Sequence, residues 1–526
     1  MSMNEKQALA ILKEPNGSEK LAAKAEEAFE ACLNLLKQEE PAAAAFLVRV
    51  ARQKKYREQI NHWLGNRSIL YRLLGSDDAK MRKNIARLIG QLAVSADVLP
   101  LAEALEQESK RLVIPSMILA LGALKTPEAV AALHAYQVRP AQEAAEEKHV
   151  QAELEALKTA LSAFKQLPSH TFKGFSSKMP LELRCGRGLE RALAEELACL
   201  DVREVKPGRV GVAVTKWEEL KASRIWREAL IPLSRGVEVK LDNAQSIKAS
   251  AVAIAAAAGH KMLAILKDVY SGEPPYAFRV ELAGQPELTK AVSRMVEAVE
   301  DGKYLVNAPS NYEAELRVEL YKGQAALYLK LFLTPDRRFE YRKAAVPASI
   351  HPTNAAGVIR LAKPYLKEGA TVLDPCCGSG TLLWERAIYG SCRSLTGVDL
   401  QRSALQAAAE NYKSARAGGM QGARVACKLV CSDFLKYRPE QPVDELFANL
   451  PFGNRVGSHE ENLRLYKGLA ERIPQWVKPG GLAVLYTMEG KLLEQCLYGN
   501  SRLKILKKYK VEAGGLEPKV LIVRVL

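Results

Sequence analysis

The spacing of apolar residues divides the 526-residue chain into three regions. Residues 1–165 carry apolar residues every three or four positions in short runs, which predicts helices and almost no strand. Two of these runs, at 73–92 and 121–137, are typical of helical hairpins that bury their apolar faces by stacking on the next pair, as in HEAT repeats. Because no exact repeat length can be counted, a plain helical bundle is the alternative.

The pattern changes after a polar segment. Residues 166–180 contain prolines and few apolar residues, which predicts a linker. From 181 to 335 the pattern mixes alternating runs with helical ones, which predicts a small α+β region. Its expected elements are a strand, a helix and two strands over 181–215, helices at about 219–229 and 246–256, a strand at 276–284, a helix at 287–301, and a hairpin over 314–333 that turns at Lys322 and Gly323.

The last region, residues 336–526, alternates strand and helix. Its apolar runs are TVLD, SLTGVDL, VACKLVCSDF, ELFANLPFG and LAVLYT, each followed by a helical run or a turn. This order predicts a doubly wound, mostly parallel sheet. Two β-rich runs flank Gly514 and Gly515, so a final antiparallel hairpin should complete a seven-stranded sheet.

Charge is distributed unevenly. The net charge is +16; residues 1–167 hold 23 Lys plus Arg and 21 Asp plus Glu, so the remaining residues carry +14. An excess of this size favours a polyanionic partner for the later regions, although a generally basic protein would show it too.

Composition narrows the location and the chemistry. The start of the chain lacks the apolar core of a secretory signal, and the longest apolar stretch, 249–259, is shorter than the roughly 20 residues of a membrane helix. We therefore expect a cytoplasmic protein without a membrane partner. The nine cysteines form no C-x-x-C pair, which predicts reduced thiols and no metal site.

The stretch DPCCGSGT joins the first strand of the last region to a helix. Gly378 and Gly380 can adopt positive φ and let a ligand approach the backbone, next to the free N–H groups of the helix start. Asp374 stands at the strand end, where doubly wound sheets bind ligands. Cys376 and Cys377 are adjacent and should diverge, which makes joint metal binding improbable. An ordinary structural turn is the competing interpretation.

Two further strands end in a carboxylate. Asp399 follows Gly380 by 19 positions, a spacing at which a carboxylate reaches a ribose diol, and this also fits NAD. Asp433 could accept from an adenine amino group, with Phe434 against the ring. Strand-end aspartates also cap helices, so the argument depends on the three acids occurring in order.

The segment NLPFG ends the fourth strand. An amino group conjugated to an aromatic ring is a poor nucleophile, and a site that methylates it needs an acceptor for its protons and a flat face for the ring. Asn449 supplies an acceptor, the backbone carbonyl beside Leu450 a second, and Phe452 the face, while Pro451 stiffens the loop by fixing φ.

In this order DPCCGSGT, GVDL, SDF and NLPFG, preceded by HPTNAAGVIRLA, resemble the motifs of class I S-adenosylmethionine-dependent amino-methyltransferases. Together with the element order of 181–335, residues 170–526 resemble THUMP-domain guanosine-N2 tRNA methyltransferases. The resemblance implies a ferredoxin-like plus THUMP RNA-binding region before a Rossmann-like catalytic domain. It assigns S-adenosylmethionine binding to Asp374, Pro375, Cys377, Gly378, Gly380, Asp399, Leu400, Asp433 and Phe434, and catalysis to Asn449, Leu450, Pro451 and Phe452.

The implied activity is N2-methylation of a guanosine in tRNA, with rRNA as the second choice and the acceptor stem as the expected location. Leu450 replaces the first proline of the Asp-Pro-Pro or Asn-Pro-Pro found in many relatives, which leaves the acceptor open to adenine N6 or protein glutamine. A non-catalytic RNA-binding scaffold is a further alternative. The helical region lies outside the resemblance and is expected to bind a protein partner.

Overall fold

The computed structural model describes residues 3–141, 143, 146–162, 168–285, 287–309, 311–347, 349–420, 422, 424–451 and 459–526. The chain forms two compact units, residues 1–167 and 168–526. Each unit is described separately below.

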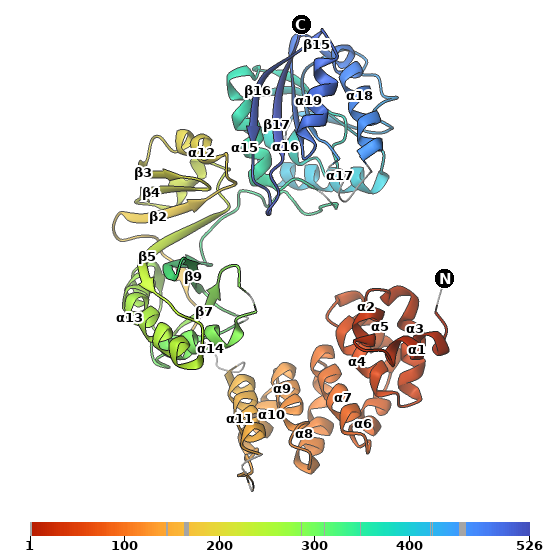
Figure 1. Cartoon of the computed structure of the whole chain (residues 1–526), viewed down its shortest axis with the longest axis vertical. Helices are drawn as coiled ribbons and strands as arrows, with labels where there is room; N and C mark the ends of the chain where they lie inside the picture. Colours follow the sequence, from red (N-terminus) through yellow and green to blue (C-terminus); the bar gives the residue numbers. More distant parts are fainter. Residues whose placement is uncertain are drawn as a thin grey trace. The chain divides into compact units, whose positions relative to one another are not determined.

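The first unit is helical throughout its described residues, as predicted (Figure 1). Its elements are α1 (Glu5–Leu12), α2 (Gly17–Ala22), α3 (Ala25–Lys37), α4 (Pro41–Val50), α5 (Lys54–Leu64), α6 (Ser68–Leu74), α7 (Ala79–Leu92), the 3-10 helix η1 (Ser95–Asp97), α8 (Val98–Gln107), α9 (Ile114–Leu124), α10 (Pro127–Ala135) and α11 (Glu147–Ser162). Apolar faces of these helices share one hydrophobic core.

Helices α7, α9 and α11 pack in succession through small residues. A Cβ atom added to Gly90 of α7 would lie 3.1 Å from the Ala120 Cα of α9, and one added to Gly122 would lie 2.8 Å from the Ala160 Cα of α11. The glycines therefore allow the helix backbones to approach closely. Buried ion pairs join neighbouring segments of this unit, among them Arg82 with Glu108 at 2.7 Å.

The second unit begins with a mixed eight-stranded sheet in the order β3-β4-β2-β5-β10-β9-β7-β8. Its strands are β2 (Met179–Arg184), β3 (Asp201–Lys206), β4 (Arg209–Val214), β5 (Glu228–Glu238), β7 (Tyr276–Leu282), β8 (Leu305–Asn307), β9 (Ala314–Tyr321) and β10 (Gln324–Leu331), and its helices are α12 (Glu190–Glu196), η3 (Trp217–Ala222), α13 (Ala244–Val269) and α14 (Thr289–Val299). A separate pair, β1 (Thr171–Phe172) and β6 (Tyr270–Ser271), places a short strand inside the predicted linker.

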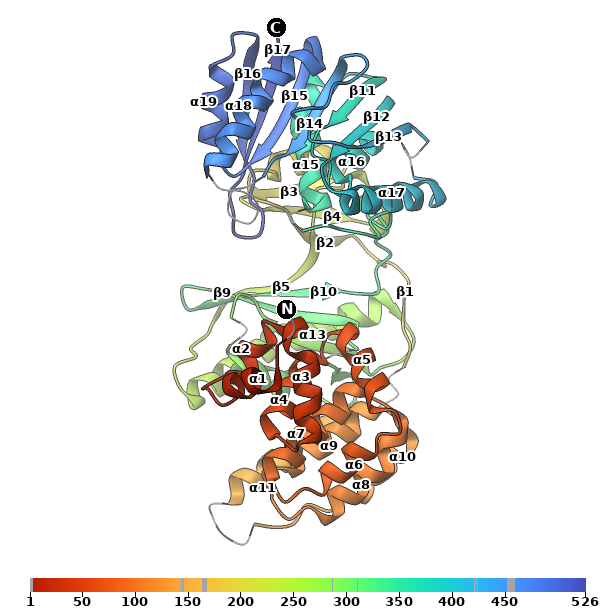
Figure 2. The same ribbon diagram turned by 90° about the vertical axis from the view of Figure 1, so that its right-hand side faces the viewer.

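Strand β5 connects the two halves of this sheet. Its first residues pair with β2 and its later residues with β10, so one strand belongs to both halves (Figure 2). The hairpin turn at Lys322 and Gly323 has φ of 49° and 76°, as the Lys-Gly pair predicts. The helix predicted at about 219–229 is wrong: a 3-10 helix ends at Ala222 and β5 begins at Glu228. Its apolar residues instead fill the core, where the Trp226 indole N–H donates to the Leu220 carbonyl at 3.0 Å.

Helix α13 is, among the described residues, the one helix whose length and composition would allow it to cross a membrane. A third of its most apolar window, 33%, is buried within the protein. The buried side includes Ile254, Ala258, Met262 and Leu266, which belong to the core beneath the eight-stranded sheet. Core helices pass the same test of length and composition, so this feature is weak evidence for a membrane span.

The rest of the second unit is the predicted seven-stranded sheet, in the order β13-β12-β11-β14-β15-β17-β16. The strands are β11 (Ala370–Asp374), β12 (Cys392–Asp399), β13 (Ala426–Cys431), β14 (Val443–Asn449), β15 (Val477–Thr487), β16 (Leu503–Lys510) and β17 (Lys519–Val525), and the helices are α15 (Pro352–Ala362), η4 (Lys363–Tyr365), α16 (Thr381–Tyr389), α17 (Arg402–Ala417), α18 (His459–Trp476) and α19 (Gly490–Tyr498). β17 runs antiparallel between β15 and β16, which confirms the final hairpin.

Both faces of this sheet are covered, because alternate residues of each strand enter different cores. On β15, Val484 and Tyr486 pack with α15 and α16, whereas Ala483 and Leu485 pack with α18 and α19 (Figure 2). The carboxyl ends of β11, β12 and β14 thus meet at one edge, where the predicted site residues stand.

Candidate active site

The glycine turn between β11 and α16 has the backbone that its sequence predicts. Gly378 and Gly380 have φ of 52° and 80°, the left-handed region that only glycine enters without strain. A Cβ atom on Gly380 would lie 2.6 Å from the Trp384 indole nitrogen, which donates to the Ser379 carbonyl at 3.3 Å. A side chain at Gly380 would therefore displace the tryptophan that closes the turn.

Asp374 ends β11 with a side chain that is 1% exposed. Its Oδ1 atom accepts the Cys376 N–H at 3.1 Å. Burial raises the pKa of Asp374 to about 8; the Cys376 N–H acts against this rise and the nearby Asp399 charge adds to it. Asp374 is followed by the buried Pro375, which begins the turn.

Asp399 is held against the glycine turn. Its Oδ2 accepts the Gly378 N–H at 2.9 Å and its Oδ1 accepts the Gln401 N–H at 2.9 Å. The carboxylate is part exposed, so it can accept a further donor from a ligand. Leu400, the next residue, is 70% exposed. The two predicted motifs, CGSG and GVDL, are thereby joined in one structure.

Asp433 follows β13, the strand that pairs with β12. The ends of these two strands are joined, because the Ser432 N–H donates to the Asp399 carbonyl at 3.0 Å. The Asp433 Oδ1 accepts the Leu435 N–H at 2.9 Å. The Phe434 ring meets the Trp476 indole edge to face, with centroids 6.4 Å apart. This contact fixes one edge of the ring.

The two adjacent cysteines of the turn have packing roles. Cys377 is buried beneath β12, where a Cβ atom on Gly397 would lie 2.8 Å from its sulfur. The Cys376 thiol donates to the Asn449 carbonyl at 3.5 Å and so connects the turn to β14. Burial raises the pKa of both thiols far above the ordinary range. No group of three His, Cys, Asp or Glu side chains in the described residues could hold a metal ion.

Asn449 ends β14 and is part exposed. It pairs in register with Tyr486 of β15, and the Leu450 N–H donates to the Tyr486 carbonyl at 2.9 Å. The Pro451 carbonyl accepts the Tyr466 hydroxyl at 2.8 Å. Phe452 lies outside the described residues, so its assignment as the stacking face stays a prediction.

The glycine turn is covered by a segment that the sequence did not single out. Asn411 of α17 is fully buried and donates to the carbonyls of Ser379 and Ala344 at 3.0 and 2.8 Å. The Ser349 hydroxyl lies 3.1 Å from that of Ser379. Asn411 thus ties Ala344, 67 positions away, to the turn, and it stands in an ordinary helical run that gives no signal of this role.

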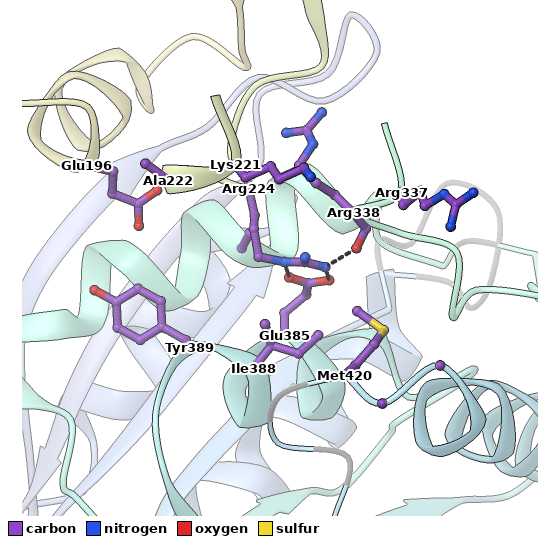
Figure 3. Close-up of a pocket in the computed structure, with 13 residues that line it drawn as sticks. Glu196, Lys221, Ala222, Arg224, Arg337, Arg338, Glu385, Ile388, Tyr389 and Met420 are labelled. Carbon is purple, nitrogen blue, oxygen red and sulfur yellow. Dashed lines mark hydrogen bonds and ion pairs between the residues drawn. The ribbon is translucent and has the colours of Figure 1, made fainter. Parts of the chain in front are cut away.

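A separate cavity of about 810 Å3 lies along α16, between it and the end of α12 (Figure 3). Its centre holds Arg224, which donates to both Glu385 carboxylate oxygens at 2.7 and 2.9 Å. The Tyr341 hydroxyl donates to the same carboxylate at 2.8 Å. None of the site residues predicted from the sequence lines this cavity, which joins the middle region to the seven-stranded domain.

Residues 339–519 match the family described as UPF0020: RMKL-like, methyltransferase domain. The tRNA (guanine(6)-N2)-methyltransferase of Thermus thermophilus is 30% identical over 263 residues, which are 46% of this chain and 75% of that protein. The ribosomal RNA large subunit methyltransferase K/L of Saccharophagus degradans is 24% identical over 417 residues, 68% of this chain and 52% of that protein. The tRNA (guanine(6)-N(2))-methyltransferase THUMP3 of Mus musculus is 29% identical over 225 residues, 41% of this chain and 44% of that protein.

Among solved structures, TrmN from Thermus thermophilus superimposes with a TM-score of 0.50 at 25% identity, covering 66% of this chain and 100% of that chain. SMU.472, complexed with SAH, gives a TM-score of 0.51 at 17% identity and shares the fold, covering 67% of this chain and 99% of that chain. The doubly wound sheet with its glycine turn defines a class I methyltransferase domain. The chain belongs to the RMKL-like methyltransferase family.

Tyr466→Phe should lower kcat for methyl transfer about threefold to tenfold, because one neutral hydrogen bond of about 1 kcal/mol to the Pro451 carbonyl is lost. The cofactor Kd should stay unchanged, since the Tyr466 hydroxyl bonds to Pro451 and Thr487, neither of which is assigned to the cofactor. Steady-state kinetics at saturating RNA measure the effect. Tyr276→Phe, which removes a hydroxyl that donates to the Gly272 carbonyl far from β14, is the matched control. Equal losses in the two variants would contradict a role of Tyr466 at the site.

Proposed function

We propose that this protein methylates the 2-amino group of a guanosine in tRNA, with S-adenosylmethionine as the methyl donor. The main support is that three predicted parts of the site meet at one edge of the sheet: the turn from Asp374 to Gly380, the Asp399 carboxylate and the end of β14 at Asn449. Two hydrogen bonds connect them, one from the Gly378 N–H to Asp399 and one from the Cys376 thiol to the Asn449 carbonyl. Relatives named as guanine-N2 methyltransferases of tRNA and of U6 snRNA support the choice of acceptor.

The site fits this cofactor. Both Gly378 and Gly380 hold the turn at positive φ, the backbone of Gly378 is part exposed to a ligand, and the part-exposed Asp399 can accept from a ribose hydroxyl. Asp433 and Phe434 would hold the adenine, and the turn with Asp374, Pro375 and Cys377 would hold the methionine end. When bound, S-adenosylmethionine supplies an electrophilic methyl group on a sulfonium sulfur.

The protein's own contribution is alignment. The Asn449 amide oxygen and the carbonyl beside Leu450 would accept the two N–H protons of the guanine amino group and turn its lone pair toward the methyl carbon. Phe452 would hold the ring. Because the reaction is an in-line displacement, orientation of this kind supplies most of the acceleration. The methylated nitrogen can lose its proton to water, so a strong base at the site is unnecessary.

Residues 168–335 would bind the RNA, and we propose that they form a ferredoxin-like plus THUMP region. The base must leave its helix to reach Asn449, which costs a few kcal/mol that phosphate contacts can offset. Residues 168–526 carry a net charge of +14 for such contacts, the remainder of the total +16 after residues 1–167.

RNA binding should weaken steeply with salt. Between about 50 and 200 mM salt the association constant should fall about tenfold or more, because each phosphate contact releases counterions. Fluorescence anisotropy with labelled tRNA measures it, and cofactor affinity over the same range is the control, which should stay flat. A flat plot for tRNA would remove the electrostatic argument for a nucleic-acid substrate.

Ribosomal RNA is the second candidate, because the K/L relative aligns over 68% of this chain. Purified tRNA and rRNA, each incubated with the protein and labelled donor, separate the two. Labelled N2-methylguanosine in tRNA supports the proposal, and label confined to rRNA selects the second candidate. Turnover with either excludes the scaffold alternative, and label in adenine would identify another acceptor.

We further propose that the helical unit is a HEAT-type stack that binds a protein partner. The support is the succession of α7, α9 and α11 through Gly90 and Gly122. We place the enzyme in the cytoplasm, since its nine cysteines are free thiols, as in reducing compartments.

A further inference from the structure

A chain of polar contacts runs from the middle region to the end of β14. It starts at Arg227, which immediately precedes β5 and whose N–H donates to the Arg184 carbonyl at 2.7 Å. The Arg227 guanidinium crosses to the seven-stranded domain. There its Nη2 atom donates to the Asn354 Oδ1 at 2.8 Å and to the Glu512 carbonyl at 3.0 Å.

Asn354 lies in the first turn of α15 and is 1% exposed. Its Nδ2 atom donates to the Glu512 carbonyl at 3.3 Å, so the amide is oriented by both Arg227 and Glu512. Helix α15, which carries Asn354, packs against β15, which carries Tyr486. Burial raises the pKa of the Tyr486 hydroxyl to about 12, and Asn354 and the Arg227 charge act in the opposite direction. Arg227 is therefore close enough for its charge to act on Tyr486.

Tyr486 connects this set of contacts to Asn449, the proposed proton acceptor. It pairs in register with Asn449, and residues paired in this way project to the same face of a sheet. Its carbonyl also accepts the Leu450 N–H. The position of the Asn449 side chain and that of the Leu450 backbone thus both depend on the position of Tyr486.

The segments around Arg227 are tightly packed. A Cβ atom on Gly186 would lie 2.6 Å from the Glu512 carbonyl and 3.2 Å from the Arg227 Nη2 atom. The Glu512 N–H donates to the Arg187 carbonyl at 2.9 Å. The loop between β2 and α12 is therefore pressed against the segment between β16 and β17, with little space for Arg227 to move.

We infer that Arg227 is a positioning residue for the methyl-transfer step, because it fixes the end of β14 through Asn354 and Tyr486. The region proposed to bind RNA would thereby also set the position of the proton acceptor Asn449. The inference rests on the proposed function for its reaction, but the contact relay itself can be tested without turnover. Nothing in the sequence around Arg227 signals this role, because its partners are 127 and 285 positions away.

Arg227→Gln should lower kcat with saturating tRNA about tenfold, because a small misplacement of the acceptor is enough to slow an aligned displacement. The KM for tRNA and the cofactor Kd should change by less than about twofold. Arg227→Lys, which keeps a charge and one donor, should recover part of kcat. Tyr486→Phe should cause a similar loss, and the double variant should lose no more than either single one, since both act through one contact chain.

Hydrogen exchange of the backbone around Leu450 supplies a readout independent of activity, and it should be faster in Arg227→Gln than in the wild type. Arg360→Gln is the matched control. Arg360 also lies on α15 and donates across the same two regions, to Glu195 at 2.8 Å, without touching Asn354. It should change neither kcat nor this exchange.

The outcomes separate the two claims. If the wild type methylates RNA and Arg227→Gln changes only KM, or leaves both kcat and exchange as they were, the relay is wrong and the proposed function stands. If the wild type methylates no RNA, the proposed function fails, and the exchange result alone decides the relay: faster exchange around Leu450 supports it and unchanged exchange overturns it.

Discussion

Asn449→Ala should abolish measurable methyl transfer, a loss of about 1,000-fold in kcat, while the cofactor Kd stays within about twofold of the wild type. The reason is the delocalised lone pair of an aromatic amine, which becomes nucleophilic only when an acceptor draws its protons out of the ring plane. The Asn449 amide oxygen has this role in our proposal, at a strand end held by the Tyr486 pairing and by the Cys376 thiol.

Single-turnover assays with labelled donor measure the chemical step, and calorimetry measures cofactor binding. Asn500→Ala is the control, because Asn500 is another part-buried asparagine; its side chain donates to the Ala470 carbonyl at a turn before β16, away from the glycine turn. Its kcat should match the wild type. Retention of most activity in Asn449→Ala, or parallel loss of activity and cofactor binding, would contradict the acceptor role.

Asp399→Ala should raise the cofactor Kd by at least about tenfold, the effect of one charge-assisted hydrogen bond. The loss should approach about 100-fold, because the Gly378 N–H loses its partner as well and the turn is no longer held. At saturating cofactor kcat should recover, since Asp399 does not contact the methyl acceptor in our proposal.

Asp301→Ala is the matched control for that experiment. Its carboxylate also accepts backbone N–H groups of a turn, those of Lys303, Tyr304 and Leu305, but in the middle region. It should lower thermal stability and leave the cofactor Kd unchanged. An Asp399→Ala protein that binds the cofactor as tightly as the wild type would remove this carboxylate from the ligand site.

The seven-stranded sheet could be predicted because each of its strands is a short apolar run that ends in a recognisable turn, and helical runs separate them. The 219–229 segment could not, because its apolar residues Leu220, Ile225 and Trp226 are all required by the core, and tertiary packing decided between helix and irregular backbone. β5 escaped prediction since its pairing with both β2 and β10 depends on residues far along the chain.

The glycine turn was predictable from local chemistry, since glycine adopts the positive φ of Gly378 and Gly380 without the steric cost of a Cβ atom. The order of the strands predicted that Asp399 ends a strand near the turn, but its hydrogen bond with the Gly378 N–H is known only from the structure. Asn411 and Tyr466 were not predictable, because a buried amide and a buried phenol in helical runs have no local pattern that distinguishes them from surface residues. The role of Phe452 rests on the sequence alone.

The most direct measurement is nucleoside mass spectrometry of tRNA after incubation with the protein and a donor carrying a deuterated methyl group. Our account predicts deuterated N2-methylguanosine in tRNA treated with the wild type and none in tRNA treated with Asn449→Ala. Absence of the label from guanosine with the wild type, or its full retention with Asn449→Ala, would contradict it.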